Sequence, residues 1–299
     1  MTTSLVTGGL GFIGSHIVDE LLSLGHKVIV IDDKSASENE KFYENKSATN
    51  IIKDISKDDC SEHFLNVDYV FHLAARSRIQ PTIGSPNQCF EVNVVGTQRV
   101  LEWSRMHSIK RIIYSGTSSL YGHQNAIPFQ PNMPSDCLNP YSMSKWMGEQ
   151  VCKLYSQLYG VNSTVLRYFN VYGPREPVKG QYAPVIGLFK RQVANKKPLT
   201  IVGDGHQKRD FTYVTDVVHS NICAMNLSNK NKFNIYNVGT GKNYTINEIA
   251  KLVSKKETVI EYIDLRPAEV KETLADITLT TRDLGWTPKI NLEEVIHEY

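Results

Sequence analysis

The sequence predicts an α/β fold in which a doubly wound parallel sheet is followed by a smaller C-terminal α/β lobe. Three observations predict it. Apolar, strand-like runs alternate with helical periodicity in the first half, a glycine-rich turn follows the first run, and an acidic pair ends the second. At 299 residues the chain is long enough to bury the core that such a fold requires.

The first elements occur in the order strand, glycine turn, helix, strand and acid. Thr3–Thr7 is a short strand, followed by the G-x-x-G-x-x-G pattern of Gly8, Gly11 and Gly14. Apolar residues then recur at helical spacing as far as Gly25, a suitable C-terminal cap. An apolar strand, 27–31, completes the unit.

This order is typical of a Rossmann-type dinucleotide-binding unit. Gly8 permits the tight turn, Gly11 lets the backbone approach a pyrophosphate at the helix N-terminus, and Gly14 lets the helix pack closely on the strand. Asp32 ends the second strand, where its carboxylate can accept hydrogen bonds from adenosine ribose hydroxyls. A carboxylate there would repel a 2′-phosphate, so we expect NAD rather than NADP.

The alternation continues through the first half. We predict a strand at Val67–Ala75, a helix from about Asn87 to His107, and a strand at Arg111–Ser115. Ala74 and Ala75 lie at the carboxyl end of one strand, and Ser115 to Thr117 at the end of the next. Ligands of doubly wound sheets bind at such ends.

The pattern is less regular after residue 170. We predict a strand at Leu199–Val202 and helices at Asp216–Asn226 and Ile246–Ser254, the last capped by Thr245. We therefore assign residues 1–169 to an NAD-binding domain, to which segments near 214–239 return. Residues 170–299 are expected to form mainly a substrate-binding lobe.

Composition excludes several classes of protein. The chain has 41% hydrophobic and 21% charged residues and a net charge of +2, which gives no reason to expect a nucleic-acid or membrane partner. No apolar stretch approaches the ~20 residues needed to span a bilayer. Because the first strand begins almost at once, no room remains for a signal peptide, and we expect a cytoplasmic protein. The five scattered cysteines predict neither a disulfide framework nor a metal site.

Tyr141 and Lys145 are four residues apart, about one turn of a helix. Tyrosine titrates near pH ~10, and a neighbouring ammonium group favours the phenolate and lowers that pKa. Such a pair can take a proton from a sugar hydroxyl and return it. The spacing is common by chance, so its meaning depends on the rest of the chain.

Eight segments support a specific resemblance. They are T-G-G-L-G-F-I-G at 7–14, H-L-A-A at 72–75, N-V-V-G-T at 93–97, T-S-S-L-Y-G at 117–122, Y-S-M-S-K at 141–145, L-R-Y-F-N-V-Y-G-P-R at 166–175, G-D-G-H-Q-K-R-D-F-T-Y-V-T-D-V at 203–217 and Y-N-V-G-T-G at 236–241. In this order, and over nearly the whole chain, they resemble the extended short-chain dehydrogenase/reductase family, in particular nucleotide-sugar 4-epimerases such as UDP-glucose and UDP-N-acetylglucosamine 4-epimerases.

The resemblance implies three catalytic residues. Thr117 would bridge the sugar O4 and the tyrosine, Tyr141 would accept and donate the proton, and Lys145 would hold the nicotinamide ribose and lower the tyrosine pKa. NAD would oxidise C4, and the 4-keto sugar would turn and receive the hydride on its other face. NAD is thereby regenerated and behaves as a prosthetic group.

The resemblance also implies two sets of binding residues. The residues expected to contact NAD are Gly8, Gly11, Phe12, Ile13, Gly14, Asp32, Asp54, Ile55, Leu73, Ala74, Ala75, Asn93, Ser115, Lys145 and Tyr168. Those expected to contact the UDP-sugar are Arg78, Thr117, Asn170, Ala183, Val185, Arg209, Arg266, Glu269 and Thr273. Asn93 and Tyr168 would lie on the nicotinamide side, Asn170 near the substrate phosphates, and Arg209 and Arg266 would clamp the diphosphate.

Ser118 and Ser119 discriminate between reactions within the family. Dehydratases resembling this chain carry Asp-Glu after the threonine, and decarboxylases carry a glutamate at the position of Ser119. Without a carboxylate here, neither reaction has its expected acid–base group. Epimerisation at C4 needs only Thr117, Tyr141 and bound NAD, so the resemblance favours it.

Two positions bear on the sugar. Thr273 falls where epimerases restricted to glucose and galactose carry tyrosine, so a smaller residue there predicts room for an acetamido group and the substrates UDP-GlcNAc and UDP-GalNAc, with UDP-Glc and UDP-Gal alongside. The segment 173–186 also resembles that of UDP-N-acetylglucosamine 4-epimerases. Arg78 could meet a uronic carboxylate, which keeps UDP-glucuronate 4-epimerase as the alternative.

Other readings stay open. An NAD-dependent nucleotide-sugar reductase would release NADH during turnover, whereas an epimerase retains it. A non-catalytic NAD sensor usually lacks the tyrosine or lysine, and this chain has both. Met147, Val151, Leu154 and Leu158 form an apolar stripe at helical spacing, most of which is ordinary core. The resemblance implies that this helix and the one near 93–107 pair with their copies in a four-helix bundle, forming a homodimer.

Overall fold

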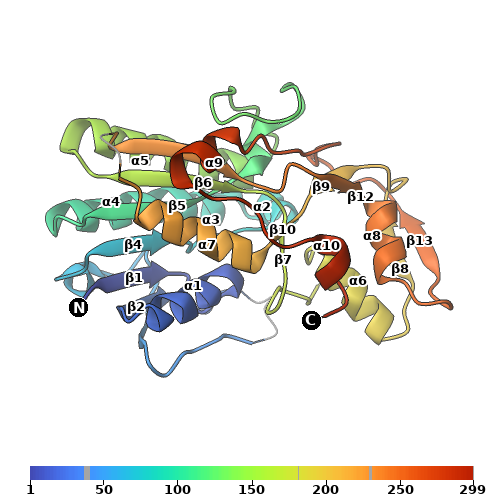
Figure 1. The fold of residues 1–299 in the computed structure, drawn as a ribbon, viewed down its shortest axis with the longest axis horizontal. Helices are drawn as coiled ribbons and strands as arrows, with labels where there is room; N and C mark the ends of the chain where they lie inside the picture. Colours follow the sequence, from blue (N-terminus) through green and yellow to red (C-terminus); the bar gives the residue numbers. More distant parts are fainter. Residues whose placement is uncertain (37–40, 181, 229–230, 299) are drawn as a thin grey trace.

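A seven-stranded parallel sheet forms the centre of the protein (Figure 1). The computed structural model describes residues 1–36, 41–180, 182–228 and 231–298. In spatial order the strands are β11 (Phe233–Val238), β6 (Ser163–Tyr168), β5 (Arg111–Thr117), β4 (Tyr69–His72), β1 (Thr3–Thr7), β2 (Lys27–Asp32) and β3 (Thr49–Ile52). The order reverses direction between β1 and β4, which is the point where ligands bind in such sheets. The predicted α/β class and doubly wound topology are confirmed.

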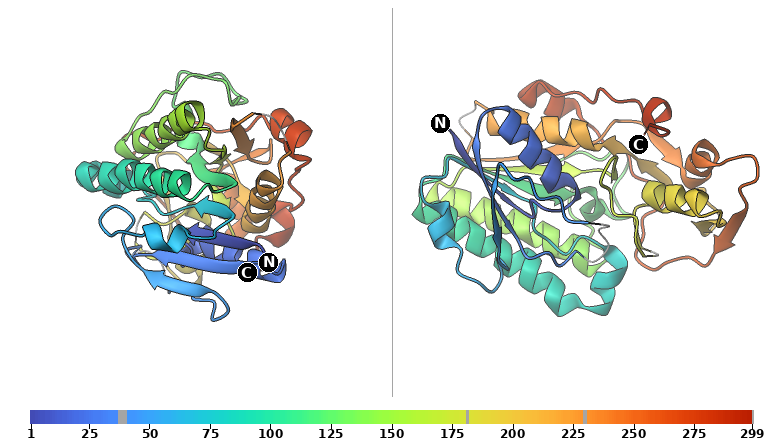
Figure 2. Two further views of the ribbon diagram at one scale, coloured as in Figure 1. Left: turned by 90° about the vertical axis from the view of Figure 1, so that its left-hand side faces the viewer. Right: turned by 90° about the horizontal axis from the view of Figure 1, so that it is seen from below.

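Helices cover both faces of the sheet. One face packs against α1 (Phe12–Ser23), α7 (Val214–Met225) and α9 (Thr278–Leu284), and the other against α4 (Gly96–Met106) and α5 (Pro140–Tyr159). Successive strand residues enter opposite cores, as the pleat requires: Leu5 packs with α4 and α5, and Val6 with α1 and α7. Helices α4 and α5 lie side by side on the outer surface (Figure 2).

Two predicted elements differ from those observed. The helix predicted from Asn87 to His107 consists of α3 (Pro86–Phe90), a π-type turn at Glu91–Val95, and α4. Helix α2 (Ile79–Gly84) precedes it. The strand predicted at Val67–Ala75 is only the four-residue β4, because beyond His72 the chain leaves the sheet and turns along the edge where ligands are expected. Of the strands in the sheet, β3, β6 and β11 were not predicted as strands.

The C-terminal lobe has its own core. It contains α6 (Val185–Ala194), α8 (Ile246–Val253) and α10 (Leu292–Val295), and the strand pairs β8 (Leu199–Val202) with β13 (Ile260–Ile263) and β9 (Lys208–Asp210) with β12 (Asn243–Thr245). Thr245 caps α8 as predicted, since its hydroxyl accepts from the Glu248 amide at 3.1 Å. The short pair β7 (Val171–Tyr172) and β10 (Thr212–Tyr213) connects the lobe to the sheet.

Helix α7 and strand β11 lie within 214–239, the segment predicted to return to the first domain. They pack on α1 and pair with β6 respectively. The division of the chain at residue 170 stays a prediction. Two short 3₁₀ turns, at Ser61–Phe64 and Ser118–Tyr121, complete the described structure. In the part of the chain that the structure describes, no helix is long and apolar enough to cross a membrane.

Candidate active site

A cleft of about 510 Å³ opens where the carboxyl ends of β1, β4, β5 and β6 face the C-terminal lobe. Every residue predicted to contact NAD or the UDP-sugar lines this cleft, apart from Asn93. The fold thus brings together glycines near residue 10, the Tyr141 helix, and residues 209–273 of the lobe. The individual ligand contacts of these residues stay predictions.

The glycine turn is shaped for close approach of a ligand. Gly8 has a φ of +70°, and a Cβ there would lie 2.7 Å from the amide nitrogen of Ala74. A Cβ at Gly14 would lie 2.1 Å from the carbonyl oxygen of Gly8. Only glycine fits either position without a shift of the backbone. Helix α1 then begins at Gly11 with no side-chain cap, so its N-terminus faces the cleft as an anion site, which fits the pyrophosphate of a dinucleotide.

Asp32 lies at the end of β2 on the same side of the cleft. Its carboxylate accepts hydrogen bonds from the backbone amides of Leu10 at 3.1 Å and Lys34 at 2.8 Å. Burial raises its pKa, and these two hydrogen bonds act in the opposite direction. The carboxylate is therefore fixed in orientation beside the glycine turn, where it fits the ribose hydroxyls of NAD.

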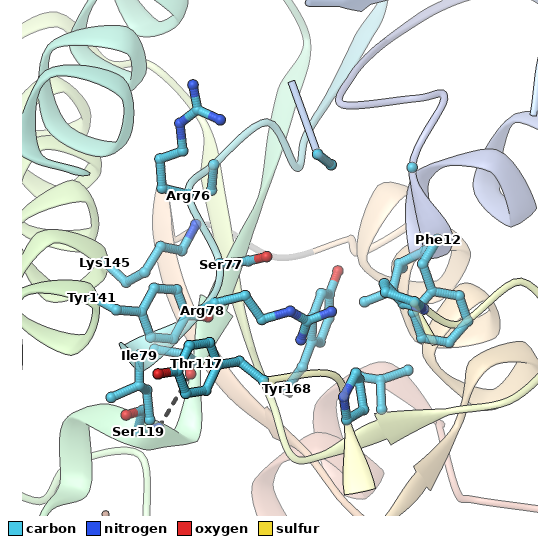
Figure 3. A pocket seen from close by; sticks show the side chains of 18 of the residues that line it. Phe12, Arg76, Ser77, Arg78, Ile79, Thr117, Ser119, Tyr141, Lys145 and Tyr168 are labelled. Carbon is cyan, nitrogen blue, oxygen red and sulfur yellow. Dashed lines mark hydrogen bonds between the residues drawn. The ribbon is translucent and has the colours of Figure 1, made fainter. Parts of the chain in front are cut away.

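Tyr141 and Lys145 come from the first two turns of α5 and line the cleft, and Tyr141 lies beside Thr117 (Figure 3). The helix starts sharply because Asn139 caps it: its side-chain oxygen accepts from the Ser142 amide at 2.8 Å. Thr117 ends β5, and its hydroxyl also accepts from the amide of Ser119 at 3.2 Å. The Thr117 hydroxyl lies near enough to the Tyr141 phenol to lower its pKa. The two side chains come from different elements, so only the fold brings them together.

Burial and neighbouring groups act in opposite directions on the pKa of Tyr141. Burial raises it, and the Thr117 hydroxyl and the Arg78 guanidinium lower it. The role of Lys145 in lowering this pKa stays a prediction; Lys145 Nζ lies over the ring of Tyr114, 4.2 Å from the ring centroid. Burial lowers the pKa of Lys145 to about 8, and the carboxylate of Glu149 acts in the opposite direction. The sequence did not predict that burial removes water from both Tyr141 and Lys145, because the spacing of residues along a helix does not show burial.

A buried ion pair supports the catalytic helix from behind. Arg167 on β6 contacts both carboxylate oxygens of Glu149 on α5, the shortest distance being 2.8 Å. Arg167 also donates to the Tyr121 hydroxyl at 2.8 Å and to the Pro131 carbonyl at 3.0 Å. Sequence reasoning did not identify this cluster. The only local signal was a glutamate four residues beyond Lys145.

Asn93 does not line the cleft, which differs from its predicted place beside the nicotinamide. Its side chain is 1% exposed and lies beneath the loop that does line it. It accepts from the Arg76 amide at 2.7 Å and donates to the Arg76 carbonyl at 3.0 Å. It also donates to the Ser144 hydroxyl on α5 at 2.9 Å. Asn93 therefore fixes the loop after β4 to the catalytic helix, and the π-type turn that carries it allows this inward orientation.

Arg78 extends into the cleft beside Tyr141 and Thr117, whereas Arg76 points away from them (Figure 3). Across the cleft, the Arg266 guanidinium lies 5.3 Å from the ring centroid of Tyr182. Arg209 donates to its neighbour's carbonyl at 2.9 Å, and burial lowers its pKa. These cations give the sugar-nucleotide side a positive potential suited to a diphosphate.

Thr273 is 3% exposed, and its hydroxyl is already engaged. It accepts from the Asp210 amide at 3.1 Å and from the Asn170 side chain at 3.3 Å. Gln181, within the segment predicted to contact substrate, lies outside the described residues. Many further residues line the cleft without a predicted role, among them Gln80, Tyr182 and Gln207. Gln207 belongs to a family-like segment and could have been found from it.

Comparison with known proteins agrees with this site. Residues 4–239 match the model of the NAD dependent epimerase/dehydratase family. A candidate UDP-glucose 4-epimerase of Methanocaldococcus jannaschii is 38% identical over 98% of this chain and 95% of its own length. A UDP-glucuronate 4-epimerase of Thermodesulfobacterium geofontis is 33% identical over 97% and 92%.

A solved structure shares the whole fold. The UDP-N-acetylglucosamine 4-epimerase from Methanobrevibacter ruminantium M1, in complex with UDP-N-acetylmuramic acid, has a TM-score of 0.92 and 33% identity, covering 99% of this chain and 96% of that one. The matched family extends over most of the chain, including the glycine turn and the Tyr141 helix. The chain belongs to the NAD-dependent epimerase/dehydratase family.

Proposed function

We propose that this NAD-dependent enzyme epimerises C4 of a UDP-sugar through a 4-keto intermediate, with UDP-GlcNAc and UDP-GalNAc as its principal pair. The observation that carries the reaction type is the placement of Tyr141 beside Thr117 at the end of β5, with serines rather than carboxylates following Thr117. Bound NAD supplies reversible hydride acceptance at C4.

The residues of the chain then have separate tasks. Tyr141 takes the O4 proton and returns it, and the Thr117 hydroxyl bridges the sugar O4 and the phenol. The guanidinium of Arg78 stabilises the phenolate, as does the Thr117 hydroxyl. Arg209 and Arg266 hold the diphosphate while the sugar turns. Gly8 and Gly14 allow the turn to pack closely on the neighbouring backbone, and Gly11 lets the cofactor pyrophosphate approach the helix N-terminus.

The choice of sugar is supported by Thr273. A small residue lines the cleft at the position where glucose-restricted relatives carry tyrosine, which leaves space for a C2 acetamido group. The same space also accommodates UDP-Glc and UDP-Gal, so we expect the enzyme to epimerise these sugars at an equal or lower rate.

A second candidate is UDP-glucuronate 4-epimerase activity. It is favoured by Arg78, whose guanidinium lies in the cleft next to Tyr141 and would pair with a C6 carboxylate. Relatives with this name are among those similar to the chain.

One experiment tests both candidates. Purified enzyme is incubated separately with UDP-GlcNAc, UDP-Glc and UDP-GlcA, and the C4 epimers are followed by proton NMR. Turnover of UDP-GlcNAc supports the first proposal, and turnover of UDP-GlcA alone supports the second. Accumulation of free NADH would indicate net oxidation of the sugar by a dehydrogenase, and net consumption of added NADH would indicate a reductase.

We also propose a homodimer formed by α4 and α5 of two copies. Met106 on α4 is 58% exposed, and Leu154 and Leu158 on α5 are 48% and 64% exposed. The predicted apolar stripe is therefore only partly core, and its C-terminal part faces outward. An apolar surface on two adjacent helices suits a four-helix bundle. Light scattering after size exclusion should give twice 33.8 kDa, and a monomer would contradict the proposal.

A further inference from the structure

Two side-chain amides of the N-terminal half reach one loop of the C-terminal lobe. Gln80 on α2 donates to the carbonyl oxygen of Pro267 at 3.1 Å, and Asn139 donates to that of Ala268 at 3.2 Å. The two acceptors are consecutive residues, and the residues on either side of them, Arg266 and Glu269, line the cleft. The loop is thus attached at two neighbouring peptide groups.

Asn139 uses both ends of its amide. Its oxygen caps α5 by accepting from the Ser142 amide at 2.8 Å, and its nitrogen holds the loop. The side chain is 8% exposed, so its orientation is restricted. Because the amide is planar, the position of the loop is coupled directly to the first turn of α5, which carries Tyr141.

The loop needs such support because its backbone is strained. Ala268 has a φ of +60°, which is uncommon and unfavourable for a residue with a Cβ. A conformation of this kind persists when the surrounding structure holds it in place. The two amide contacts converge on Ala268 and the residue before it. They keep Arg266 facing the cleft.

We propose that Gln80 and Asn139 form a latch that holds the 266–269 loop over the nucleotide diphosphate and couples its binding to the placement of Tyr141. Both are positioning residues. This proposal rests on the proposed function in taking the ligand to be a UDP-sugar. In the latched position, Arg266 is preorganised for the diphosphate, so binding does not have to order the loop.

The test separates the latch from the helix cap. Asn139→Ser keeps a capping oxygen but is too short to reach Ala268, and Gln80→Ala removes the second contact without touching the cap. Asn291→Ser is the matched control, because Asn291 caps α10 away from the cleft by accepting from the Glu293 amide at 3.1 Å. UDP is titrated into each NAD-loaded enzyme by calorimetry, and melting temperature and KM are measured in parallel.

We expect each latch variant to weaken UDP binding about twofold to tenfold, the contribution of one hydrogen bond. The double variant should lose less UDP affinity than the product of the two single losses, because breaking one contact with the loop also weakens the other. KM should rise with the dissociation constant. Asn291→Ser should bind UDP like the unaltered enzyme.

Unchanged UDP affinity in Gln80→Ala would overturn the latch, and so would equal weakening in Asn291→Ser. If Asn139→Ser fails to fold, the UDP affinity of Gln80→Ala alone tests the latch. An unaltered enzyme that does not bind UDP would overturn the proposed function and this proposal with it. An unaltered enzyme that binds UDP, with variants that bind it equally well, would overturn the latch alone.

Discussion

Replacing Glu149 by glutamine tests whether the buried ion pair behind α5 supports both the fold and the catalytic lysine. The Glu149 side chain is fully buried, and the Arg167 side chain is 4% exposed. Arg167 donates three hydrogen bonds to the carboxylate, at 2.8, 3.1 and 3.2 Å. Glutamine keeps the volume and one acceptor, but it removes the charge and turns an NH₂ group toward the guanidinium.

The expected loss of stability follows from the charges. Two unit charges about 4 Å apart attract by roughly 4 kcal/mol at an effective dielectric constant near 20. Removal of one partner from a buried pair costs about 3–5 kcal/mol, because the other charge stays buried without compensation. We therefore expect Glu149→Gln to lower the free energy of unfolding by about 3–5 kcal/mol, measured by urea denaturation.

The same change should shift the pH dependence of turnover. Burial lowers the pKa of Lys145 to about 8, while Glu149 and, more weakly, Cys152 and Cys89 raise it. His72 also lies near this lysine, and its pKa of about 3 leaves it neutral. Without the Glu149 carboxylate the pKa of Lys145 falls further. Lys145 then loses its charge at a lower pH, so the alkaline limb of the kcat/KM profile shifts to lower pH.

The double variant Glu149→Gln/Arg167→Met separates the two effects. It leaves no buried guanidinium unpaired, so it should lose less stability than Glu149→Gln alone, yet it should show the same shift of the alkaline limb. The role of the ion pair would be refuted if the free energy of unfolding of Glu149→Gln lay within about 1 kcal/mol of that of the unaltered enzyme and the pH profile of kcat/KM were the same.

Four further predictions concern the cleft. Tyr141→Phe should lower kcat by about 10²–10⁴ while calorimetry still detects UDP binding, and near-normal turnover would exclude Tyr141 as the acid–base group. Gly14→Ala should abolish retention of NAD, read from the absorbance of the purified protein, since its Cβ would lie 2.1 Å from the Gly8 carbonyl oxygen. Asp32→Ser should raise the affinity for NADP relative to NAD, and a preference that does not change would remove the ribose assignment. Thr273→Tyr should reduce turnover of UDP-GlcNAc more than that of UDP-Glc, and equal losses for both would show that Thr273 is not the gate.

The local elements of the site could be predicted from the sequence. The turn of Gly8, Gly11 and Gly14 and the acid at the end of β2 both depend on neighbours within a few residues. Their backbone requirements therefore appear directly in the pattern. The seven-stranded parallel sheet follows from the alternation of strands and helices, although β3, β6 and β11 were not predicted as strands.

The parts of the site that the sequence misjudged depend on desolvation and on contacts between distant segments. Asn93 belongs to a recognisable motif, yet it faces Arg76 and Ser144 instead of the cleft. Lys145 has the predicted spacing from Tyr141, but burial and the ring of Tyr114 determine its pKa and position. A pattern read along one helix contains no information about burial.

By itself, the sequence determined the glycine turn, the spacing of Tyr141 and Lys145 and the class of fold, because each appears in a local pattern of residues. Only the tertiary structure showed that burial raises the pKa of Tyr141 and that Thr117 and Arg78 act in the opposite direction. It alone joined Glu149 to Arg167 and fastened the 266–269 loop to Gln80 and Asn139. These contacts join residues 18 to 187 positions apart, and the free energy of each depends on how completely the fold excludes water around it.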